Sequence, residues 1–211
     1  MALPADHPFP QVDAELGKPW GGVLAGGAGQ RLGGVDKGWL MLHGRPLVQH
    51  VIEAMGDHCT QVVINANRHL ADYAALQYPV VPDIDPYAGP LGGMVSLFAA
   101  YPQHRLWLIA PCDTVGWPDD LVPALLARYR QGGHDVVIAG CDGRPMPVLG
   151  LYGPLSQAHL LCAFQEGERS PWRALHGLRW DVLWLQPGTI VNINTPEALQ
   201  AATATEEAAP A

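Results

Sequence analysis

A glycine-rich stretch near the N-terminus is the first place where the residue types suggest chemistry. The sequence VLAGGAGQRLGGVDKGWLML, residues 23–42, contains six glycines and continues a short apolar run. Glycines let backbone N–H groups approach phosphate oxygens without a Cβ clash. Arg31 offers a planar fork to two oxygens, and Lys37 adds a movable point charge. The pattern favours a triphosphate site over its alternative, a plain glycine-rich turn with two solvated cations.

Two standard phosphate loops are excluded by the spacing. A P-loop requires GxxxxGK[ST], but Lys37 lies between Asp36 and Gly38. A dinucleotide fingerprint requires GxGxxG, and Leu32 stands where the third glycine belongs. What remains is a longer loop after the first strand, and ligands of such sheets bind at the carboxyl ends of the strands.

Three polar residues follow later apolar runs in the same way. Asn65 and Asp83 end two apolar strands, and Asp113 comes just after LWLIA at 106–110. A carboxylate at a rigid strand end suits magnesium, which prefers carboxylate and water oxygens. The alternative is that each is a turn or helix-cap residue. With the loop cations present, we expect Asp113 to bind the metal.

These motifs, in this order, resemble those of the molybdenum cofactor guanylyltransferases. The glycine-rich stretch matches the signature LAGGxxxRxGxxDK of that family, from Leu24 to Lys37. The resemblance spans roughly residues 20–200, and the ordered set is far more specific than any one piece. The further matching segments are Asn65-Ala66-Asn67-Arg68, Asp83, Gly89-Pro90-Leu91-Gly92-Gly93, Pro111-Cys112-Asp113-Thr114, Gly167-Glu168-Arg169-Ser170 and Asn192-Ile193-Asn194-Thr195-Pro196.

The resemblance implies an activity and a set of residues. The family transfers GMP from GTP to the terminal phosphate of molybdopterin and releases pyrophosphate. The resemblance implies that Asp113 binds a magnesium ion. It also implies catalytic roles for Arg31, Lys37 and Asp113. The residues it implies for GTP binding are Leu24, Ala25, Gly26, Gly27, Lys37, Asn65, Asp83 and Asp113. Those it implies for acceptor binding are Arg144, Arg169, Asn192 and Asn194.

Some of these positions carry particular expectations. Cytidine-transferring relatives tend to have alanine at the position of Gly26, so the missing methyl is expected to leave room for a purine. Met146 stands where the family often has histidine, which weakens the acceptor contact expected near Arg144. Asp36 is expected to be a structural, salt-bridged residue, with metal binding as the alternative.

The proposed chemistry needs no strong general base. The nucleophile is a phosphate monoester, largely ionised near neutral pH because its second pKa is about 6. The difficulty is bringing one anion to another, which requires cations around the reacting phosphates. Three alternatives stay open: a molybdopterin cytidylyltransferase, a sugar-1-phosphate nucleotidyltransferase, and a nucleotide-binding protein without catalysis.

Alternating strands and helices must position these residues. The pattern predicts a three-layer α/β fold with a mostly parallel, doubly wound sheet, as in the nucleotidyltransferases with a sugar-nucleotide-transferase-like fold. Strands are expected at 20–25, 61–65, 79–82, 106–110, 135–139, 147–152, 181–185 and 191–194, the segment 147–152 breaking the parallel order. Helices are expected at 46–57, 69–76, 91–101, 118–131, 154–165 and 170–177, with a last one capped by Thr195.

Length and charge limit the other possibilities. The 211 residues suit one domain at 19–203, with a GTP-binding half at 19–116 and an acceptor-binding half at 117–203. Residues 1–18 and 204–211 are expected to be a flexible extension and a flexible tail, and no signal peptide is recognised. A net charge of −8 argues against a nucleic-acid surface. No apolar run reaches the ~18 residues of a membrane span.

The remaining reactive residue types suggest no second site. The four cysteines form no CxxC pair, and we expect them to be buried and reduced, in a cytoplasmic protein. The nine histidines show no HxxxH spacing. The tryptophans are expected mainly in the core, above all Trp107. Transient contacts with cofactor biosynthesis proteins and apo-molybdoenzymes are plausible for a protein that hands on a labile cofactor.

Overall fold

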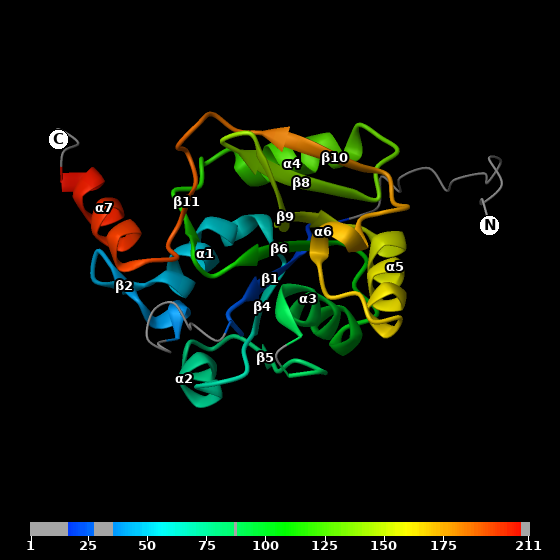
Figure 1. Ribbon diagram of the computed structural model, residues 1–211, viewed down its shortest axis with the longest axis horizontal. Coiled ribbons are helices and arrows are strands. Elements are labelled where there is room, and N and C mark those ends of the chain that lie inside the picture. The colour runs from blue at the N-terminus through cyan, green and yellow to red at the C-terminus, as the bar shows by residue number, and fades with distance from the viewer. Residues whose placement is uncertain (1–16, 28–35, 87, 208–211) are drawn as a thin grey trace.

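A seven-stranded sheet forms the centre of the computed structural model, which describes residues 17–27, 36–86 and 88–207 (Figure 1). Its strands are β1 (Trp20–Leu24), β4 (Gln61–Asn65), β5 (Val80–Val81), β6 (Trp107–Pro111), β8 (Val136–Cys141), β9 (Arg144–Tyr152) and β10 (Trp180–Trp184). They lie in the order β10-β8-β9-β6-β1-β4-β5. All neighbours are parallel except β9, which runs antiparallel to both β6 and β8. The predicted break in the parallel order is confirmed, in a strand that begins earlier than expected.

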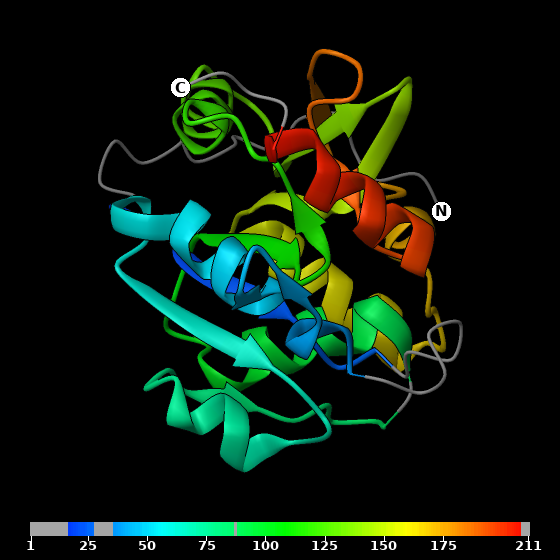
Figure 2. The ribbon, with the colours of Figure 1, turned by 90° about the vertical axis from the view of Figure 1, so that its left-hand side faces the viewer.

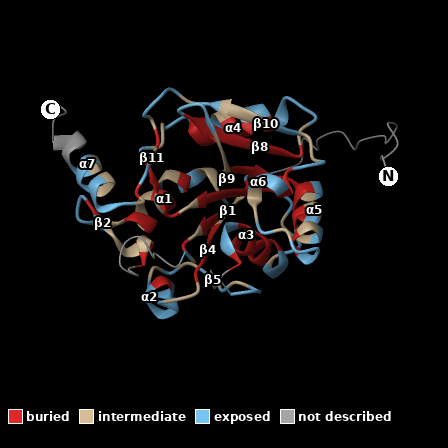
Figure 3. Ribbon diagram, in the orientation of Figure 1, coloured by how far each residue is buried: buried red, intermediate tan, exposed pale blue. Residues whose placement is uncertain are grey.

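Helices cover both faces of the sheet and make the fold three-layered, as the sequence predicts. They are α1 (Leu47–Met55), α2 (Leu70–Ala75), α3 (Gly89–Ala100), α4 (Leu121–Arg130), α5 (Pro154–Gln165), α6 (Pro171–Ala174) and α7 (Pro196–Glu207). One apolar cluster joins α1 and α4 to one face, and a second joins α3 and α5 to the other (Figure 3). Successive residues of β6 point to opposite faces of the sheet. Leu108 belongs to the cluster with α1 and α4, and Ile109 to the cluster with α3 and α5. This two-sided burial is why the strand is apolar throughout.

Two small sheets flank the main one and were not predicted in this form. The hairpin of β2 (Met41–Leu42) and β3 (Arg45–Pro46) precedes α1, so Pro46 is the N-cap of α1 rather than its first residue. Strand β11 (Val191–Asn192) pairs antiparallel with β7 (Thr114–Val115). Short 3-10 helices, η2 (Lys37–Trp39) and η3 (Gly56–His58), complete the described elements.

The last helix packs beside the hairpin at one end of the molecule (Figure 2). Thr195 caps it as predicted, because the Thr195 Oγ1 accepts a hydrogen bond from the Ala198 amide at 3.2 Å. A third apolar cluster of Leu42, Leu47, Val115 and Ile193 joins this C-terminal segment to the hairpin and to β7. Helix α7 continues past residue 203, where the sequence prediction had placed the start of a tail.

Two expectations about buried residues are wrong in part. Trp107 is fully buried, but Trp172, Trp180 and Trp184 are exposed on α6 and β10. Cys112 and Cys141 are buried, whereas Cys162 is exposed on α5, and all four cysteines are free. No helix of the described ranges is both long and apolar enough to cross a bilayer.

Candidate functional site

Four neighbouring parallel strands bring the predicted polar residues to one edge of the sheet. Strands β5, β4, β1 and β6 end there, so that Asp83, Asn65, the loop from Ala25 and Asp113 follow one another across the edge. The backbone ties these ends together: the Ala25 amide donates to the Asn65 carbonyl at 2.8 Å, and the Cys112 amide to the Leu24 carbonyl at 3.0 Å. The carboxyl ends of parallel strands are where such sheets bind ligands.

Lys37 joins three distant parts of the chain. Its Nζ donates to Asp113 Oδ2 at 2.8 Å and to Asn194 Oδ1 at 2.5 Å. The Lys37 and Asp113 side chains are only 22% and 15% exposed, so the charges are partly shielded from water. The two predicted catalytic residues in the described ranges thus meet, together with a predicted acceptor residue. A half-buried ammonium beside a carboxylate can hold phosphate oxygens and a divalent cation side by side.

The C-terminal segment reaches this point through backbone pairing. The Ile193 amide donates to the Asp113 carbonyl at 2.8 Å, and β11 pairs with β7 immediately after Asp113. Asn192 is exposed, and its Oδ1 accepts a hydrogen bond from the Thr114 hydroxyl at 2.9 Å. Asn192 and Asn194 therefore both lie beside Asp113, as expected if nucleotide and acceptor meet there.

A second polar cluster occupies the other end of the edge. Both oxygens of the Asp83 carboxylate accept amide donors, Oδ1 from Asn65 Nδ2 at 2.8 Å and Oδ2 from Asn67 Nδ2 at 2.7 Å. Asn65 is buried, and its Nδ2 also lies 3.1 Å from the Val81 carbonyl. Asn65 and Asp83 are thus brought together as predicted. Asn67 was not predicted to act, although it stands in the matched segment and two residues after a strand end.

Gly26 lies against this cluster of side-chain amides. A Cβ at Gly26 would lie 2.8 Å from Asn67 Nδ2 and 3.3 Å from Asn65 Oδ1. The expectation was that the missing methyl leaves room for a purine. In the structure the space beside Gly26 is taken by the side-chain amides of the protein itself.

Asp36 is structural, but not in the way expected. The carboxylate is buried, and its Oδ1 accepts hydrogen bonds from the Tyr73 hydroxyl at 2.7 Å and the Gly38 amide at 3.1 Å. Burial, with help from Asp36, raises the pKa of Tyr73 far above its ordinary value, so the hydroxyl stays a donor. Lys37 pairs with Asp113 instead of Asp36. Among the described residues, Asp36 therefore makes hydrogen bonds and no salt bridge, and these bonds hold the 3-10 turn that begins at Lys37.

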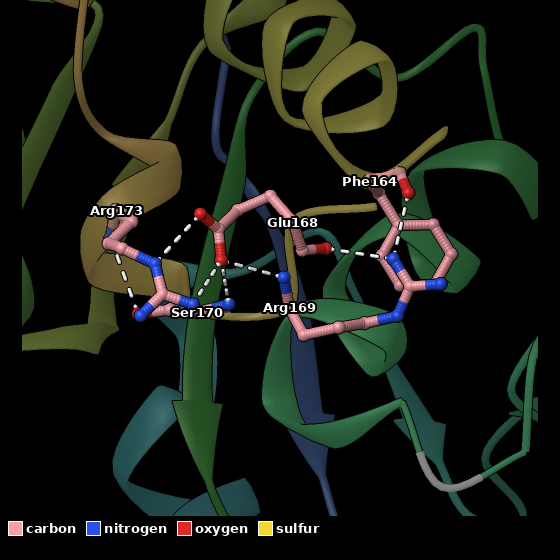
Figure 4. Close-up of polar contacts among 5 residues, drawn as sticks. All are labelled: Phe164, Glu168, Arg169, Ser170 and Arg173. Carbon is pink, nitrogen blue, oxygen red and sulfur yellow. Dashed lines mark hydrogen bonds and ion pairs between the residues drawn. The ribbon is translucent and has the colours of Figure 1, made fainter. Parts of the chain in front are cut away.

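The two predicted acceptor arginines differ in their surroundings. Arg144 is exposed at the start of β9, on the hairpin that follows β8 at the same edge as Asp113. The Arg169 guanidinium instead donates to the carbonyls of Phe164 and Glu168 at 2.8 and 2.9 Å and to Asp85 at 3.2 Å, with its Cζ 4.1 Å from the Phe164 ring centroid (Figure 4). These contacts tie the end of α5 to the loop before α3.

The remaining predicted residues lie on the glycine-rich loop. Leu24 ends β1, and Gly27 is the last residue described before the gap at 28–35. Arg31 lies outside the described residues. A cation that the sequence reasoning gave no role, Arg68, donates to the Gly27 carbonyl at 3.2 Å.

The residues present suit a magnesium ion that arrives with a nucleotide. Within the described residues, no three histidine, cysteine, aspartate or glutamate side chains gather into a metal site. Magnesium is usually held by one or two carboxylates together with substrate phosphates and water. Asp113 supplies one such carboxylate at the rigid end of β6, which fits that mode of binding.

Comparison with known proteins identifies the relatives of this chain. Residues 21–180 match the family model described as MobA-like NTP transferase domain. A protein of Shewanella loihica named molybdenum cofactor guanylyltransferase is 36% identical over 194 residues, which cover 90% of this chain and 95% of that protein. One of the same name from Shewanella frigidimarina is 37% identical with the same coverage.

Solved structures agree at the level of the fold. The molybdopterin-guanine dinucleotide biosynthesis protein A of Archaeoglobus fulgidus superposes with a TM-score of 0.71 at 23% identity, over 89% of this chain and 98% of that one. A CMP:2-keto-3-deoxy-manno-octonic acid synthetase in complex with CTP superposes with a TM-score of 0.73 at 14% identity, over 90% of this chain and 99% of that one. The family model and the close relatives go further than the fold: this chain belongs to the MobA-like nucleotidyltransferases, the family that includes the molybdenum cofactor guanylyltransferases.

Proposed function

We propose that this protein transfers GMP from GTP to the terminal phosphate of molybdopterin, giving the guanine dinucleotide form of the molybdenum cofactor and pyrophosphate. The observation that carries the proposal is the meeting of Lys37, Asp113 and Asn194 at the carboxyl edge of the sheet. Relatives that share about a third of the sequence over nearly its whole length bear the name of this activity. The chain is accordingly a nucleotidyltransferase.

The phosphates of GTP would lie at the Asp113 end of the edge. Lys37 donates to phosphate oxygens there, together with backbone amides of the glycine-rich loop and with Arg31. Its two acceptors fix the position of its Nζ before the nucleotide arrives, so little reorganisation is needed. A positioned cation stabilises the negative charge that gathers on the α-phosphate and the departing pyrophosphate.

Asp113 is the residue that would hold magnesium. When bound, the ion would neutralise charge on the phosphate oxygens. We propose that the activity depends on magnesium for this reason. Lys37 would keep the Asp113 carboxylate oriented, since the two groups are 2.8 Å apart.

The base would lie at the Asp83 end. Asp83 follows β5 and Asp113 follows β6, three strands apart, a separation of about 14 Å across the edge. The base is the part of a nucleotide farthest from its phosphates, so this separation favours base contacts, rather than ribose contacts, for Asp83 and Asn65. Leu24, Ala25, Gly26 and Gly27 lie between the two ends, on the strand and loop that separate β4 from β6.

The acceptor would approach from the C-terminal half. Asn192 and Asn194 stand beside Asp113, and Arg144 stands on the neighbouring hairpin. We propose that these three contact the acceptor phosphate or pterin. The same role for Arg169 is weaker, because its guanidinium already has four partners.

The remaining proposals concern the whole chain. We propose a GTP-binding half at 19–116 and an acceptor-binding half at 117–203 within one domain, with action in the cytoplasm. The four free cysteines agree with a reducing compartment. Hand-over of the product implies transient contacts with cofactor biosynthesis proteins and apo-molybdoenzymes.

Pyrophosphate release tests the proposal. We expect release from GTP in the presence of magnesium and molybdopterin, with little from CTP. Asp113→Ala should lower the rate by roughly 10²–10³-fold, the scale of losing one electrostatic stabiliser. Asp57→Ala is the matched control, because this exposed carboxylate lies on η3 before β4, at the opposite edge of the sheet. Release from CTP instead, or an Asp113→Ala rate equal to wild type, would contradict the proposal.

A further inference from the structure

The side-chain amide of Asn67 makes two hydrogen bonds with Asp83. Its Nδ2 donates to Asp83 Oδ2 at 2.7 Å, and its Oδ1 accepts from the Asp83 backbone amide at 2.8 Å. Asn67 lies two residues beyond the end of β4, and Asp83 two residues beyond the end of β5. The pair therefore locks the loop after β5 to the loop after β4. Because both the backbone and the side chain of Asp83 are held, the carboxylate has one orientation.

This orientation leaves a defined pair of acceptors. Each carboxylate oxygen has two lone-pair sites. Among the described side chains, Asn65 donates to one site on Oδ1 and Asn67 to one site on Oδ2, which leaves one site on each oxygen. Two adjacent acceptors complement two adjacent donors, and guanine presents such donors in its N1–H and its 2-amino group. Cytosine has no second donor beside its amino group.

Gly26 lies next to the Asn67 amide that makes these hydrogen bonds. A Cβ there would lie 2.8 Å from Asn67 Nδ2, closer than Cβ atoms normally approach. The Asn67 amide would have to move, and the atom that moves is the one that donates to Asp83. A methyl at position 26 would thus act on the base site through Asn67.

We propose that Asn67 is a positioning residue for guanine recognition, and that Gly26 is glycine in order to leave Asn67 in place. This inference rests on the proposed function, in which Asp83 contacts the base. Asn67 acts through Asp83 and does not itself read the base. It also gives a physical reason for the glycine that does not depend on the size of the base.

The test compares GTP with ITP, whose base lacks only the 2-amino group. Equilibrium affinities are measured by calorimetry on the full chain with magnesium present, so no acceptor and no transfer step are needed. Wild type should bind GTP roughly 10–100-fold more tightly than ITP, the worth of a hydrogen bond to a charged group. Asn67→Ala should bring this ratio close to one. A purely structural loss would weaken both nucleotides equally and leave the ratio unchanged.

A double-mutant cycle tests the role of Gly26. Gly26→Ala alone should reduce the GTP/ITP ratio as Asn67→Ala does, and adding it to Asn67→Ala should change nothing further. Gly17→Ala is the matched control, because a Cβ at that position meets no atom within 4 Å. Asn67→Leu keeps the branched shape of the side chain but removes its donor and its acceptor, without adding a charge beside Asp83. It should likewise bring the ratio close to one, and it replaces Asn67→Ala if the smaller side chain disturbs folding.

The outcomes are distinct. An unchanged GTP/ITP ratio in both Asn67 variants would overturn the inference. So would an equal effect of Gly26→Ala with and without Asn67, since the methyl would then meet the ligand itself. A GTP/ITP ratio that collapses in the Asn67 variants, in a protein that transfers no GMP in the pyrophosphate-release assay, would overturn the proposed function and leave the role of Asn67 supported. Failure of wild type to bind GTP would overturn both.

Discussion

At the scale of single residues, Lys37 is the group on which the site depends. Its Nζ lies within hydrogen-bonding distance of Asp113, from the end of β6, and of Asn194, from the segment after β11. Asp36, itself held by the Tyr73 hydroxyl, caps the 3-10 turn that begins at Lys37. A cation held by so many fixed neighbours is preorganised for phosphate, and this is the arrangement that electrostatic catalysis requires.

Removing the ammonium should therefore affect turnover more than folding. We expect Lys37→Ala to lower kcat/KM for GTP by roughly 10²–10³-fold. Asn194→Ala removes one of the two acceptors of the Lys37 ammonium and should lower kcat/KM for GTP about tenfold. Steady-state pyrophosphate release measures both. Lys18→Ala is the control, because the ammonium of this exposed lysine donates to the Asp57 carbonyl, away from the site. A Lys37→Ala enzyme as active as the control would refute the role of the ammonium.

The sequence could predict the residues at strand ends but not their partners. Asn65, Asp83 and Asp113 each follow an apolar run, and parallel strands bring such residues to one edge. The contact between Lys37 and Asn194 joins residues 157 positions apart, and no periodicity reveals it. Asn67 was overlooked for a related reason: its partner Asp83 lies in the loop after the neighbouring strand β5, so the pair exists only in the folded chain.

At the scale of elements, the C-terminal segment completes the site. Ile193 is fully buried in the cluster with Leu42, Leu47 and Val115, and the next residue is Asn194. The position of Asn194 therefore depends on how well this small cluster packs. The sequence predicted the capped helix α7, but it could not predict the pairing of β11 with β7, because two-residue strands carry almost no pattern.

Truncation of Ile193 should loosen this segment. We expect Ile193→Ala to lower the free energy of unfolding by about 2–5 kcal/mol, and kcat to fall because Asn194 is displaced. Leu199 packs against the same cluster but is only partly buried. Leu199→Ala should therefore lower both the free energy of unfolding and kcat by less than Ile193→Ala does. Chemical denaturation and pyrophosphate release give the two values. Lost stability with an unchanged kcat would separate the segment from catalysis.

A second element-scale feature joins α5 to α6. The Glu168 carboxylate accepts from the Arg173 guanidinium and from the Ser170 and Arg169 amides, at 2.7–2.9 Å (Figure 4). The bond from Arg173 is the main reason that the pKa of Glu168 falls from 4.5 to about 2. A lowered carboxyl pKa stabilises the folded form above the ordinary pKa, and the effect is lost as the pH falls.

This gives a defined pH window. The stabilisation declines as the pH falls from 4.5 to about 2, and near pH 2 the carboxyl is protonated in the folded protein itself. That protonation should release the turn and change the fluorescence of the adjacent, exposed Trp172. Glu168→Gln should abolish that transition, because the amide does not titrate in this range. Persistence of the transition in the Glu168→Gln protein would assign it to another group.

At the scale of the whole molecule, strand β10 is an open edge of the sheet with two exposed tryptophans. Trp180 and Trp184 are 38% and 55% exposed, although the composition suggested that tryptophans belong in the core. Apolar content alone cannot show that β10 is an edge strand, since that depends on the strand order. Asp181 protects this edge: its Oδ1 accepts the Val182 amide at 2.8 Å, and its Oδ2 accepts Arg128 Nε at 2.5 Å. Inward-turned charges are a common defence against edge-to-edge pairing.

Loss of the Asp181 carboxylate from the open edge of β10 should cause self-association. We expect Asp181→Ala to free the Val182 amide and to raise the apparent mass of the protein in light scattering as the concentration increases. Asp57→Ala, which removes the same charge from η3, controls for the lowered net charge. Equal behaviour of the two variants would show that charge, and not the edge, governs association.

The site as a whole joins a guanine nucleotide to molybdopterin. The most direct test is mass spectrometry of the product formed by the full chain from molybdopterin, magnesium, and GTP and CTP supplied together at equal concentration. We expect molybdopterin carrying GMP, in an amount that matches the pyrophosphate released. Molybdopterin carrying CMP, or an unmodified acceptor, would contradict it.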